Sequence, residues 1–520
     1  MFGLLKKKSA FLPQLSGRDY LVLFAGVLGF GALAASTVTK FSIWFDEAFG
    51  SYLIRFDYFD LTRYTAYDVH PPLYYWLLKT WSLLFGNTEL GLRSMSIFFG
   101  VVTIIFVFVL IMKLFGRRAA YVTLLFLALS PLFIRYSQEA RMYTVLTSIV
   151  AAATYVLVYA QENAKKRWPW VVYGLLLALG MLTQYFAALA WLSHWVWRAF
   201  VVRQEKGKFV KNFFTRKWVG AHIIAVVIFL PWLPWLIRQF ADVQGNGFWI
   251  PAVSSATIPD FFTNFLLFSD HESVKSWLAA GFYIVFATLV FLTARLVVLL
   301  KAKEREYYVL LISMVLVPII ILLAMSMPPL RPAFIDRYLM ASITFLPALI
   351  GVSLVIASRL YPRKVIISMG AVILAMMCVG IGVQMTIGNY NKSTHQSNNV
   401  RNILEEVRAE APANTPIIAS TPWLFYEAAI YSNANSPVYF VDGSTKYEFG
   451  SLRMLKENDS SKIKDLDAFG RSHKSFWVIA NYNDTTQGKM RDNWKITKTI
   501  IVDDSVSHKP LLQAIRVTVE

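Results

Sequence analysis

The sequence predicts a polytopic α-helical membrane protein that carries a soluble α/β domain at its C-terminus. Of its 520 residues, 56% are hydrophobic and only 16% are charged, which is far from the average of soluble proteins. Apolar runs with the length of a membrane-crossing helix, about 20 residues, recur up to residue 387. From about residue 388 onward the hydrophobicity falls to that of an ordinary soluble domain. These observations predict a transmembrane domain over residues 1–387 and an accessory domain over residues 388–520.

About 11 transmembrane helices are expected from the apolar runs. They lie near residues 20–41, 94–115, 119–134, 142–160, 170–183, 186–201, 219–237, 276–300, 307–327, 338–357 and 365–387. The third, fifth and sixth runs are short for a bilayer, so one pair of them could re-enter the membrane instead of crossing it. The parity of the count sets the side on which the C-terminus lies and matters more than the number itself.

Lys and Arg gather in every second connection between the apolar runs. The basic stretches precede the first run and then lie near residues 113–118, 165–167, 198–217, 295–305 and 359–364. Such loops stay on the cytoplasmic side, so we expect an integral protein of the plasma or inner membrane. Its N-terminus would be cytoplasmic, and its first loop and C-terminal domain extracytoplasmic. The net charge of +19 comes from these separate clusters, so membrane lipids are expected partners and nucleic acid is not.

The segments outside the apolar runs have their own periodicities. Aromatic and charged residues alternate at helical spacing within the first outer loop, residues 42–93, and within the second, residues 238–275, as expected for helices that lie at the membrane surface. In the C-terminal domain, helical and buried-strand patterns alternate, which favours a small parallel or mixed sheet. The expected surface helices are 57–64, 73–79 and 261–268; the expected C-terminal elements are helices 397–410 and 423–431 and strands 416–419, 437–441 and 475–480.

Two adjacent carboxylates, Asp46 and Glu47, follow the first apolar run directly. Acidic side chains at the edge of a bilayer are costly to desolvate and mark functional sites by default. A carboxylate in a partly dry pocket can act as a general base on an acceptor hydroxyl or amine. The alternative is that Asp46 merely caps a helix in the loop.

His70 is followed by two prolines, which force an extended entry into the next helix and hold the imidazole at a defined place. It could contact a phosphate, orient an acceptor, bind a metal or make a structural hydrogen bond. A metal site built from His70, Asp46, His271 and Glu272 has none of the usual ligand spacings. We therefore expect no cofactor, and a divalent metal stays an alternative that these spacings do not support.

Arginines flank or accompany acids at two further places. Glu139 and Arg141 lie between the third and fourth runs, and Arg337 opens the tenth run from the outer side. The planar guanidinium suits a phosphate or carboxylate ligand. The alternatives are an internal ion pair at Glu139 and a local pair between Asp336 and Arg337.

Three motifs together resemble the C-type (GT-C) membrane glycosyltransferases. They are Trp-Phe-Asp-Glu at 44–47, His-Pro-Pro-Leu-Tyr-Tyr at 70–75 and Leu-Phe-Gly-Asn-Thr-Glu-Leu-Gly-Leu-Arg-Ser at 84–94. The closest group is the protein O-mannosyltransferase and lipid A aminoarabinose transferase superfamily, similar to glycosyltransferase family 39. The resemblance covers about residues 20–360, and the C-terminal α/β tail suits bacterial members.

The resemblance implies the transfer of a hexose or pentose from a polyprenyl-phosphate carrier, usually with inversion, to a protein, lipid or glycan acceptor outside the membrane. Asp46 matches the catalytic base with Glu47 beside it, and Glu139 is similar in place to a second acid. His70 stands where some members have a lysine near the carrier phosphate, which departs from the pattern. The residues that the resemblance places at the substrate are His70, Tyr74, Arg93, Arg141 and Arg337.

Two other functions compete with this interpretation. A lipid or polysaccharide transporter or flippase would need polar residues through its spans, yet most runs here are nearly uncharged at their centres. A non-catalytic anchor for the C-terminal domain would leave Asp46 and Glu47 unexplained.

Overall fold

The computed structural model describes residues 10–205, 207–246, 250–269, 276–387, 399–433, 435–442, 452–482, 491, 493–504 and 508–520. The chain packs into two compact units. The first, here called the helical unit, consists of Met1–Ser36, Ser96–Gln138 and Met142–Thr386; the second, the loop–sheet unit, consists of Thr37–Met95, Glu139–Arg141 and Ile387–Glu520. The division of the sequence into domains 1–387 and 388–520 stays a prediction, whereas compact packing joins the first outer loop to the C-terminal segment.

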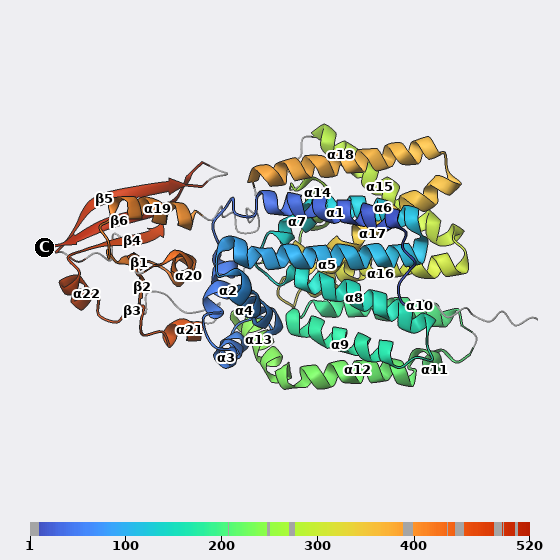
Figure 1. Cartoon of the computed structure of the whole chain (residues 1–520), viewed down its shortest axis with the longest axis horizontal. Helices are drawn as coiled ribbons and strands as arrows, with labels where there is room; N and C mark the ends of the chain where they lie inside the picture. The colour runs from blue at the N-terminus through green and yellow to red at the C-terminus, as the bar shows by residue number, and fades with distance from the viewer. Residues whose placement is uncertain are drawn as a thin grey trace, which may run out of the picture. The chain divides into compact units, whose positions relative to one another are not determined.

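Long helices build the helical unit (Figure 1), and each apolar run predicted from the sequence is helical there. The elements are α1 (Gly17–Ser36), α5 (Glu89–Phe115, which starts in the other unit), α6 (Arg117–Ala128), α7 (Pro131–Ser137), α8 (Tyr143–Glu162), α9 (Trp168–Thr183), α10 (Ala187–Arg203), α11 (Phe209–Phe213), α12 (Arg216–Phe229), η1 (Leu230–Trp232), α13 (Leu233–Asn246), α14 (Thr257–Leu267), α15 (Ser276–Leu299), α16 (Ala302–Met325), η3 (Asp336–Tyr338), α17 (Met340–Leu360) and α18 (Arg363–Ile387). The surface helix expected at 261–268 corresponds to α14.

The number of helices able to span a membrane is lower than the eleven expected. In the described ranges eight helices are long and apolar enough, or nine if α6 and α7 form one broken span with a bend of 62°. Pro131 at the start of α7 accounts for the break, since proline cannot continue the preceding helix. The fifth and sixth runs form α9 and α10, with only 16 and 17 residues. At 1.5 Å per residue such helices reach roughly 25 Å, short of a hydrocarbon core of about 30 Å.

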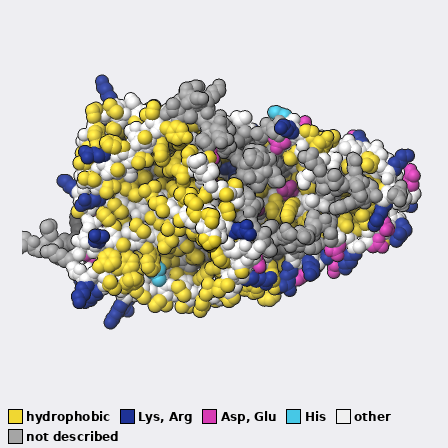
Figure 2. Space-filling view, turned by 180° about the vertical axis from the view of Figure 1, so that it is seen from behind, with side chains coloured by type: hydrophobic (Ala, Val, Ile, Leu, Met, Phe, Trp, Pro, Cys, Tyr) yellow, Lys and Arg dark blue, Asp and Glu magenta, His cyan; other side chains and the backbone are white. Residues whose placement is uncertain are grey.

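The surface of the helical unit is apolar over a wide area (Figure 2). The side chains that it exposes include Leu21 and Phe24 of α1, Val226 and Val227 of α12, Ile284 and Phe291 of α15, and Val365 and Ile367 of α18. Soluble monomers rarely expose apolar patches of this extent, whereas lipid covers them at no cost. The chain is therefore an integral multi-pass membrane protein, as the composition predicted.

The C-terminal part of the loop–sheet unit is a mixed six-stranded sheet with the order β3-β2-β1-β4-β6-β5. The first four strands in this order pair in parallel, and β6 pairs antiparallel with both β4 and β5. The predicted mixed sheet and its helices are confirmed, but β3, β5 and β6 were not expected. The elements are α19 (Val400–Glu410), β1 (Ile417–Ala419), α20 (Pro422–Tyr431), β2 (Val438–Val441), α21 (Leu452–Lys456), β3 (Lys462–Ile463), α22 (Leu466–Ser472), β4 (Ser475–Asn481), β5 (Trp494–Asp503) and β6 (Pro510–Val519).

The first outer loop folds into three short helices, α2 (Phe45–Leu53), α3 (Tyr58–Ala66) and α4 (Leu73–Phe85). The last two confirm the helices expected at 57–64 and 73–79, while α2 was not anticipated. A tight turn at Gly86, whose φ of 81° suits glycine, joins α4 to α5. A side chain on Gly91 would lie 2.5 Å from two carbonyl oxygens of that turn, so the start of α5 can pack there only with glycine.

The composition of the loop–sheet unit restricts the number of membrane crossings. The first outer loop and the C-terminal segment are joined within it, for example by an ion pair of 2.6 Å between Arg401 Nη1 and Glu89 Oε2. Both segments therefore lie on one side of the membrane. The chain must cross an even number of times between them, and α1 makes the total odd. Counts of nine or eleven meet this condition and eight does not, which favours α6 and α7 together as one broken span.

This topology makes a labelling prediction in a chain whose single cysteine, Cys378, has been replaced by alanine. Phe59→Cys in α3 and Lys498→Cys in β5 should both react with a membrane-impermeant maleimide added to intact cells. Lys303→Cys, in the basic start of α16, should react only after permeabilisation. All three side chains are exposed. Labelling of positions 59 and 498 from opposite sides would contradict the topology.

Candidate functional site

The paired acids lie in the first turn of α2. Trp44 is the N-cap residue, and Asp46 and Glu47 are the second and third residues of the helix, where the helix dipole favours negative charge. Asp46 is therefore not the N-cap residue of α2, so the alternative role of Asp46 as a helix cap is not supported. Adjacent residues point about 100° apart around a helix. The Asp46 side chain is 25% exposed, whereas that of Glu47 is fully buried.

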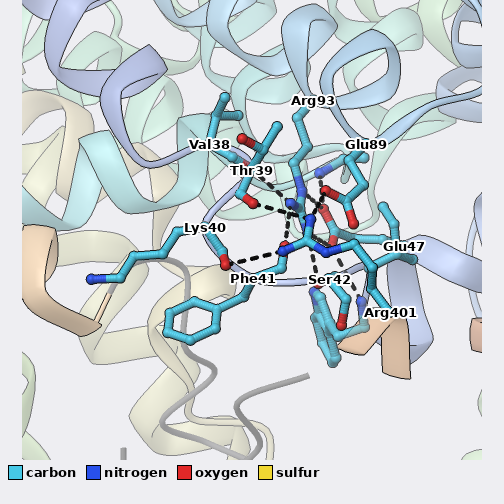
Figure 3. A network of polar contacts seen from close by, with 12 residues as sticks. Val38, Thr39, Lys40, Phe41, Ser42, Glu47, Glu89, Arg93 and Arg401 are labelled. Atoms are coloured by element: carbon cyan, nitrogen blue, oxygen red, sulfur yellow. Dashed lines mark hydrogen bonds and ion pairs between the residues drawn. The ribbon is translucent and has the colours of Figure 1, made fainter. Parts of the chain in front are cut away.

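Glu47 forms a buried, bidentate ion pair with Arg93 of α5 (Figure 3). Arg93 Nε donates to Glu47 Oε1 at 2.8 Å, and Nη2 donates to Oε2 at 2.6 Å. Each carboxylate oxygen accepts one further hydrogen bond: Oε1 from the backbone N–H of Ala140 at 2.8 Å, and Oε2 from that of Trp44 at 3.3 Å. Four donors thus saturate the carboxylate, which fixes Glu47 in place and gives it a supporting position in the site.

The remaining donors of Arg93 bind the chain that leads into α2. Nη1 donates to the carbonyl oxygens of Val38 and Phe41 at 2.7 and 2.9 Å, and Nη2 to that of Ser42 at 3.0 Å. A guanidinium has five N–H groups, and all five are used here. The resemblance placed Arg93 at the substrate, but its geometry gives it a different task, because no donor is left for a phosphate.

The segment Glu139–Arg141 brings a second arginine beside α2. Arg141 Nη1 donates to the backbone carbonyl of Asp46 at 3.0 Å and to the Tyr75 hydroxyl at 3.2 Å. Its Nη2 lies 3.8 Å from Asp46 Oδ2 and 3.3 Å from His70 Nε2. The structure therefore brings together Asp46, His70 and Arg141, which are far apart in the sequence.

The contacts of His70 define its tautomer. Arginine can only donate, so Nε2 accepts from Arg141 and carries no proton. Nδ1 then holds the proton and donates it to Asp68 Oδ2 at 3.2 Å. Asp68 orients the ring through this bond.

Tyr74 adds a buried hydroxyl to the site. Its side chain is fully buried and its hydroxyl has no hydrogen-bond partner among the described residues. Burial raises the pKa of Tyr74 well above 10, an effect that the positive charge of Arg141 partly opposes. The hydroxyl therefore keeps its proton and remains available as a donor.

The two other predicted residues lie in different units. Glu139 is buried in the loop–sheet unit, where its charge acts on Tyr74. Arg337 belongs to the helical unit, in η3, and its Nη1 donates to the Tyr143 hydroxyl at 3.5 Å. The site described for the loop–sheet unit thus includes Glu139 and does not include Arg337.

Three residues near the acids were missed by the sequence analysis. Asp68 orients His70, and its place two residues earlier could have signalled this. Tyr75 bonds Arg141 and belongs to a motif already noted. Glu427 of α20 is buried, and the charge of Glu47 acts on its pKa; nothing in its local sequence indicates this.

In the ranges that the structure describes, no three His, Cys, Asp or Glu side chains gather in a group that could hold a metal ion. His271 and Glu272 lie outside those ranges.

Breaking the buried pair should destabilise the protein strongly. Arg93→Met leaves Glu47 charged and buried, and should lower the free energy of unfolding by about 3–5 kcal/mol. The double variant Glu47→Met/Arg93→Met should recover part of that loss, since it leaves no unpaired charge. The control Arg63→Met removes a partly exposed pair with Glu457 and should cost less than about 1 kcal/mol. Tryptophan-fluorescence melts of the purified proteins measure the stability of all three variants. Equal losses of stability for Arg93→Met and Arg63→Met would contradict the structural role of the buried Glu47–Arg93 pair.

Glu427 should make stability depend on pH. Burial, and secondly the charge of Glu47, raise the pKa of Glu427 from 4.5 to about 8. Between these values the folded state keeps a proton that the unfolded state has lost, so stability falls as the pH rises through this window. Glu427→Gln cannot titrate. The melting temperature of the wild type should therefore fall relative to that of Glu427→Gln from pH 5 to pH 9, and a constant difference would contradict the assignment.

Comparison with known proteins gives matches over part of the sequence and over nearly all of the fold. Residues 69–235 match the family model described as dolichyl-phosphate-mannose-protein mannosyltransferase. Over 188 residues the chain is 28% identical to an undecaprenyl phosphate-α-4-amino-4-deoxy-L-arabinose arabinosyl transferase of Serratia proteamaculans (strain 568), covering 35% of this chain and 33% of that protein. The sequence match thus spans about a third of that relative's length.

Two solved structures share the fold. ArnT from Cupriavidus metallidurans, in a crystal structure bound to undecaprenyl phosphate, aligns with a TM-score of 0.60 and 13% identity over 96% of this chain and 98% of that one. The oligosaccharyltransferase AglB from Archaeoglobus fulgidus, in complex with an inhibitory peptide and a dolichol-phosphate, gives 0.50 and 12% over 89% and 69%. The resemblance seen in the sequence is confirmed at the level of the fold, which is that of the C-type membrane glycosyltransferases; in sequence, the similarity to the dolichyl-phosphate-mannose-protein mannosyltransferase model is confined to residues 69–235.

Proposed function

We propose that the chain is a glycosyltransferase that moves a sugar from a polyprenyl-phosphate carrier to an acceptor on the extracytoplasmic side of the membrane. The observation that carries the proposal is the contrast between the two acids. Glu47 is saturated and buried, while Asp46 is partly exposed on the same rigid turn beside Arg141. The similar proteins, an undecaprenyl phosphate-aminoarabinose transferase and two structures bound to undecaprenyl phosphate and dolichol-phosphate, support the class of donor.

The chemistry needs few groups, because a sugar phosphodiester already carries its leaving group. Asp46 accepts the proton of an acceptor hydroxyl or amine as that atom attacks the anomeric carbon. The bond from the anomeric carbon to the phosphate oxygen breaks, and the carrier departs as polyprenyl phosphate. A single displacement of this kind inverts the anomeric centre. Nearby cations and donors stabilise the charge that develops on the phosphate.

The contacts suggest how the other residues share this work. Arg141 and the Tyr74 hydroxyl are the donors that we assign to the carrier phosphate, and His70 Nε2, at 3.3 Å from Arg141 Nη2, orients the guanidinium. Glu47 and Arg93 act as positioning residues. The role of Glu139 as a second acid follows the resemblance and its place in the same unit, and that of Arg337 at the carrier phosphate follows the resemblance alone.

The arrangement in the membrane forms part of the proposal. The donor is a lipid, so residues 1–387 would form the glycosyltransferase domain that meets it within the bilayer. The acceptor, a protein, lipid or glycan, would approach from the extracytoplasmic side, where residues 388–520 form an accessory domain. Membrane lipids are the remaining partners.

Asp46→Asn should abolish transfer without unfolding the protein, since it removes the base but keeps the shape of the side chain. We expect a loss of at least ~10²-fold in turnover, with unchanged yield and melting temperature. Asp57→Asn is the matched control, because Asp57 caps α3 and asparagine caps equally well.

The assay uses full-length protein in proteoliposomes with radiolabelled undecaprenyl-phosphate-linked pentose, undecaprenyl-phosphate-linked hexose or dolichyl-phosphate mannose. Release of the free polyprenyl phosphate and transfer of label to added membrane extract are both measured. Near-normal turnover by Asp46→Asn would remove Asp46 as the base. Failure of the wild type with every donor would overturn the proposed function.

A further inference from the structure

We propose that Tyr431 and Arg401, two side chains of the C-terminal segment, are positioning residues that fix the chain leading into α2 and thereby the place of Asp46. The inference rests on the proposed function in assigning Asp46 as the base. It gives residues 388–520, proposed above as an accessory domain, a task in the reaction itself.

Residues 37–44, here called the entry chain, join α1 to α2 without forming a helix or a strand. Such a segment has no continuous ladder of backbone hydrogen bonds, so its buried polar groups need partners from side chains. The carbonyl oxygens of Val38, Phe41 and Ser42 accept from Arg93, as described above. The conformation of the entry chain is therefore set by side chains that come from other elements.

Tyr431, the last residue of α20, binds the entry chain directly. The backbone N–H of Ile43 donates to the Tyr431 hydroxyl at 2.8 Å, and the hydroxyl in turn donates to Glu89 Oε1. Burial, and secondly the charge of Glu89, raise the pKa of Tyr431, so the hydroxyl keeps the proton that it gives to Glu89. Because Ile43 is fully buried, removal of the hydroxyl would take the acceptor away from a donor in the protein interior, and the backbone would have to move to satisfy it.

Glu89 of α5 receives a second side chain from the C-terminal segment (Figure 3). Its Oε2 lies 2.6 Å from Nη1 of Arg401 in α19. Arg401 also donates to the carbonyl oxygens of Thr39 and Lys40, at 3.2 and 3.3 Å. Glu89 begins α5 and lies one helical turn before Arg93. The two arginines together thus bind the carbonyl oxygens of five successive residues of the entry chain, and one of these arginines comes from the C-terminal segment.

Aromatic rings of α20 pack along the helix that follows the entry chain. Phe45 lies 5.2 Å from Trp423, and Tyr52 lies 5.3 Å from Tyr426, measured between ring centroids. Positions 45 and 52 are seven residues apart and share one face of α2. Asp46 lies off this face and is partly exposed. The packing of α20 therefore holds α2 without burying the acid.

The consequence is a separation between turnover and donor binding. Without the contacts of Tyr431 or Arg401 the entry chain can shift, and Asp46 in the first turn of α2 moves with it. A displacement of about 1 Å in a reacting group can cost about 10²-fold in rate. Arg141, which we assign to the carrier phosphate, is held by Tyr75 and His70 as well, so the donor KM should change less than kcat.

Two variants remove one positioning contact each, and two others control for them. Tyr431→Phe deletes only the hydroxyl, and Arg401→Met deletes the guanidinium but keeps an unbranched side chain. The controls in the same segment are Tyr482→Phe, at an exposed tyrosine, and Lys498→Met, which breaks an exposed ion pair. The wild type and the four variants are compared as full-length protein in proteoliposomes, by kcat, by donor KM and by hydrogen exchange of the amides of the entry chain and α2.

We expect Tyr431→Phe and Arg401→Met each to lower kcat by about 10-fold or more, with a donor KM within about threefold of wild type, and to speed amide exchange in the entry chain. In Tyr431→Phe the acceleration should be largest at Ile43. Both controls should match the wild type in all three measurements. Wild-type kcat in Tyr431→Phe and Arg401→Met, or an equal loss of kcat in the controls, would overturn the proposal. If the wild type transfers no sugar, the proposed function fails, and exchange still decides whether the two side chains fix the entry chain: equal exchange in all variants would refute it.

Discussion

The buried ion pair between Glu47 and Arg93 is the constraint on which the rest of the site depends. Taking both charges out of water is expensive, and their attraction compensates only when every remaining donor and acceptor is satisfied. Here the carboxylate receives four hydrogen bonds and the guanidinium gives five. Any shift of α2, of the entry chain or of Ala140 would leave a buried polar group unsatisfied, so the pair selects one arrangement of three separate segments.

The motif at 84–94 gains a physical explanation from this constraint. Gly86 makes the turn after α4, Gly91 lets α5 pack against that turn, and Glu89 binds the C-terminal domain through Arg401. Together they place Arg93 beneath the acids. The motif was noted because it resembled a family of transferases, yet its residues build the support of the site. A sequence motif shared with a family of enzymes can therefore consist of residues that support the reacting group.

Much of the fold could be predicted because bilayer crossing imposes length and apolarity on each helix separately. The count was too high because α9 is apolar but too short, and α10 is both short and interrupted by His194 and Arg198. Within the site, Asp46 and His70 stood out as polar residues in apolar surroundings. The task of Arg93 and the raised pKa of Glu427 could not be predicted, since each depends on partners from distant parts of the chain, and burial of a polar residue is decided by tertiary packing.

Two adjacent acids on one helix turn meet different chemical requirements because the packing around them differs. A base, the role proposed for Asp46, must be reachable from water or substrate, and the partial exposure of the Asp46 side chain meets that need. A supporting residue must be held in one place, and the four hydrogen bonds of Glu47 do so. Their separation of one residue points them in different directions, so burial can act on Glu47 alone. The rigidity of the turn, supplied by Arg93 behind it and α20 beside it, then passes to Asp46 through the backbone, while the Asp46 side chain stays partly exposed.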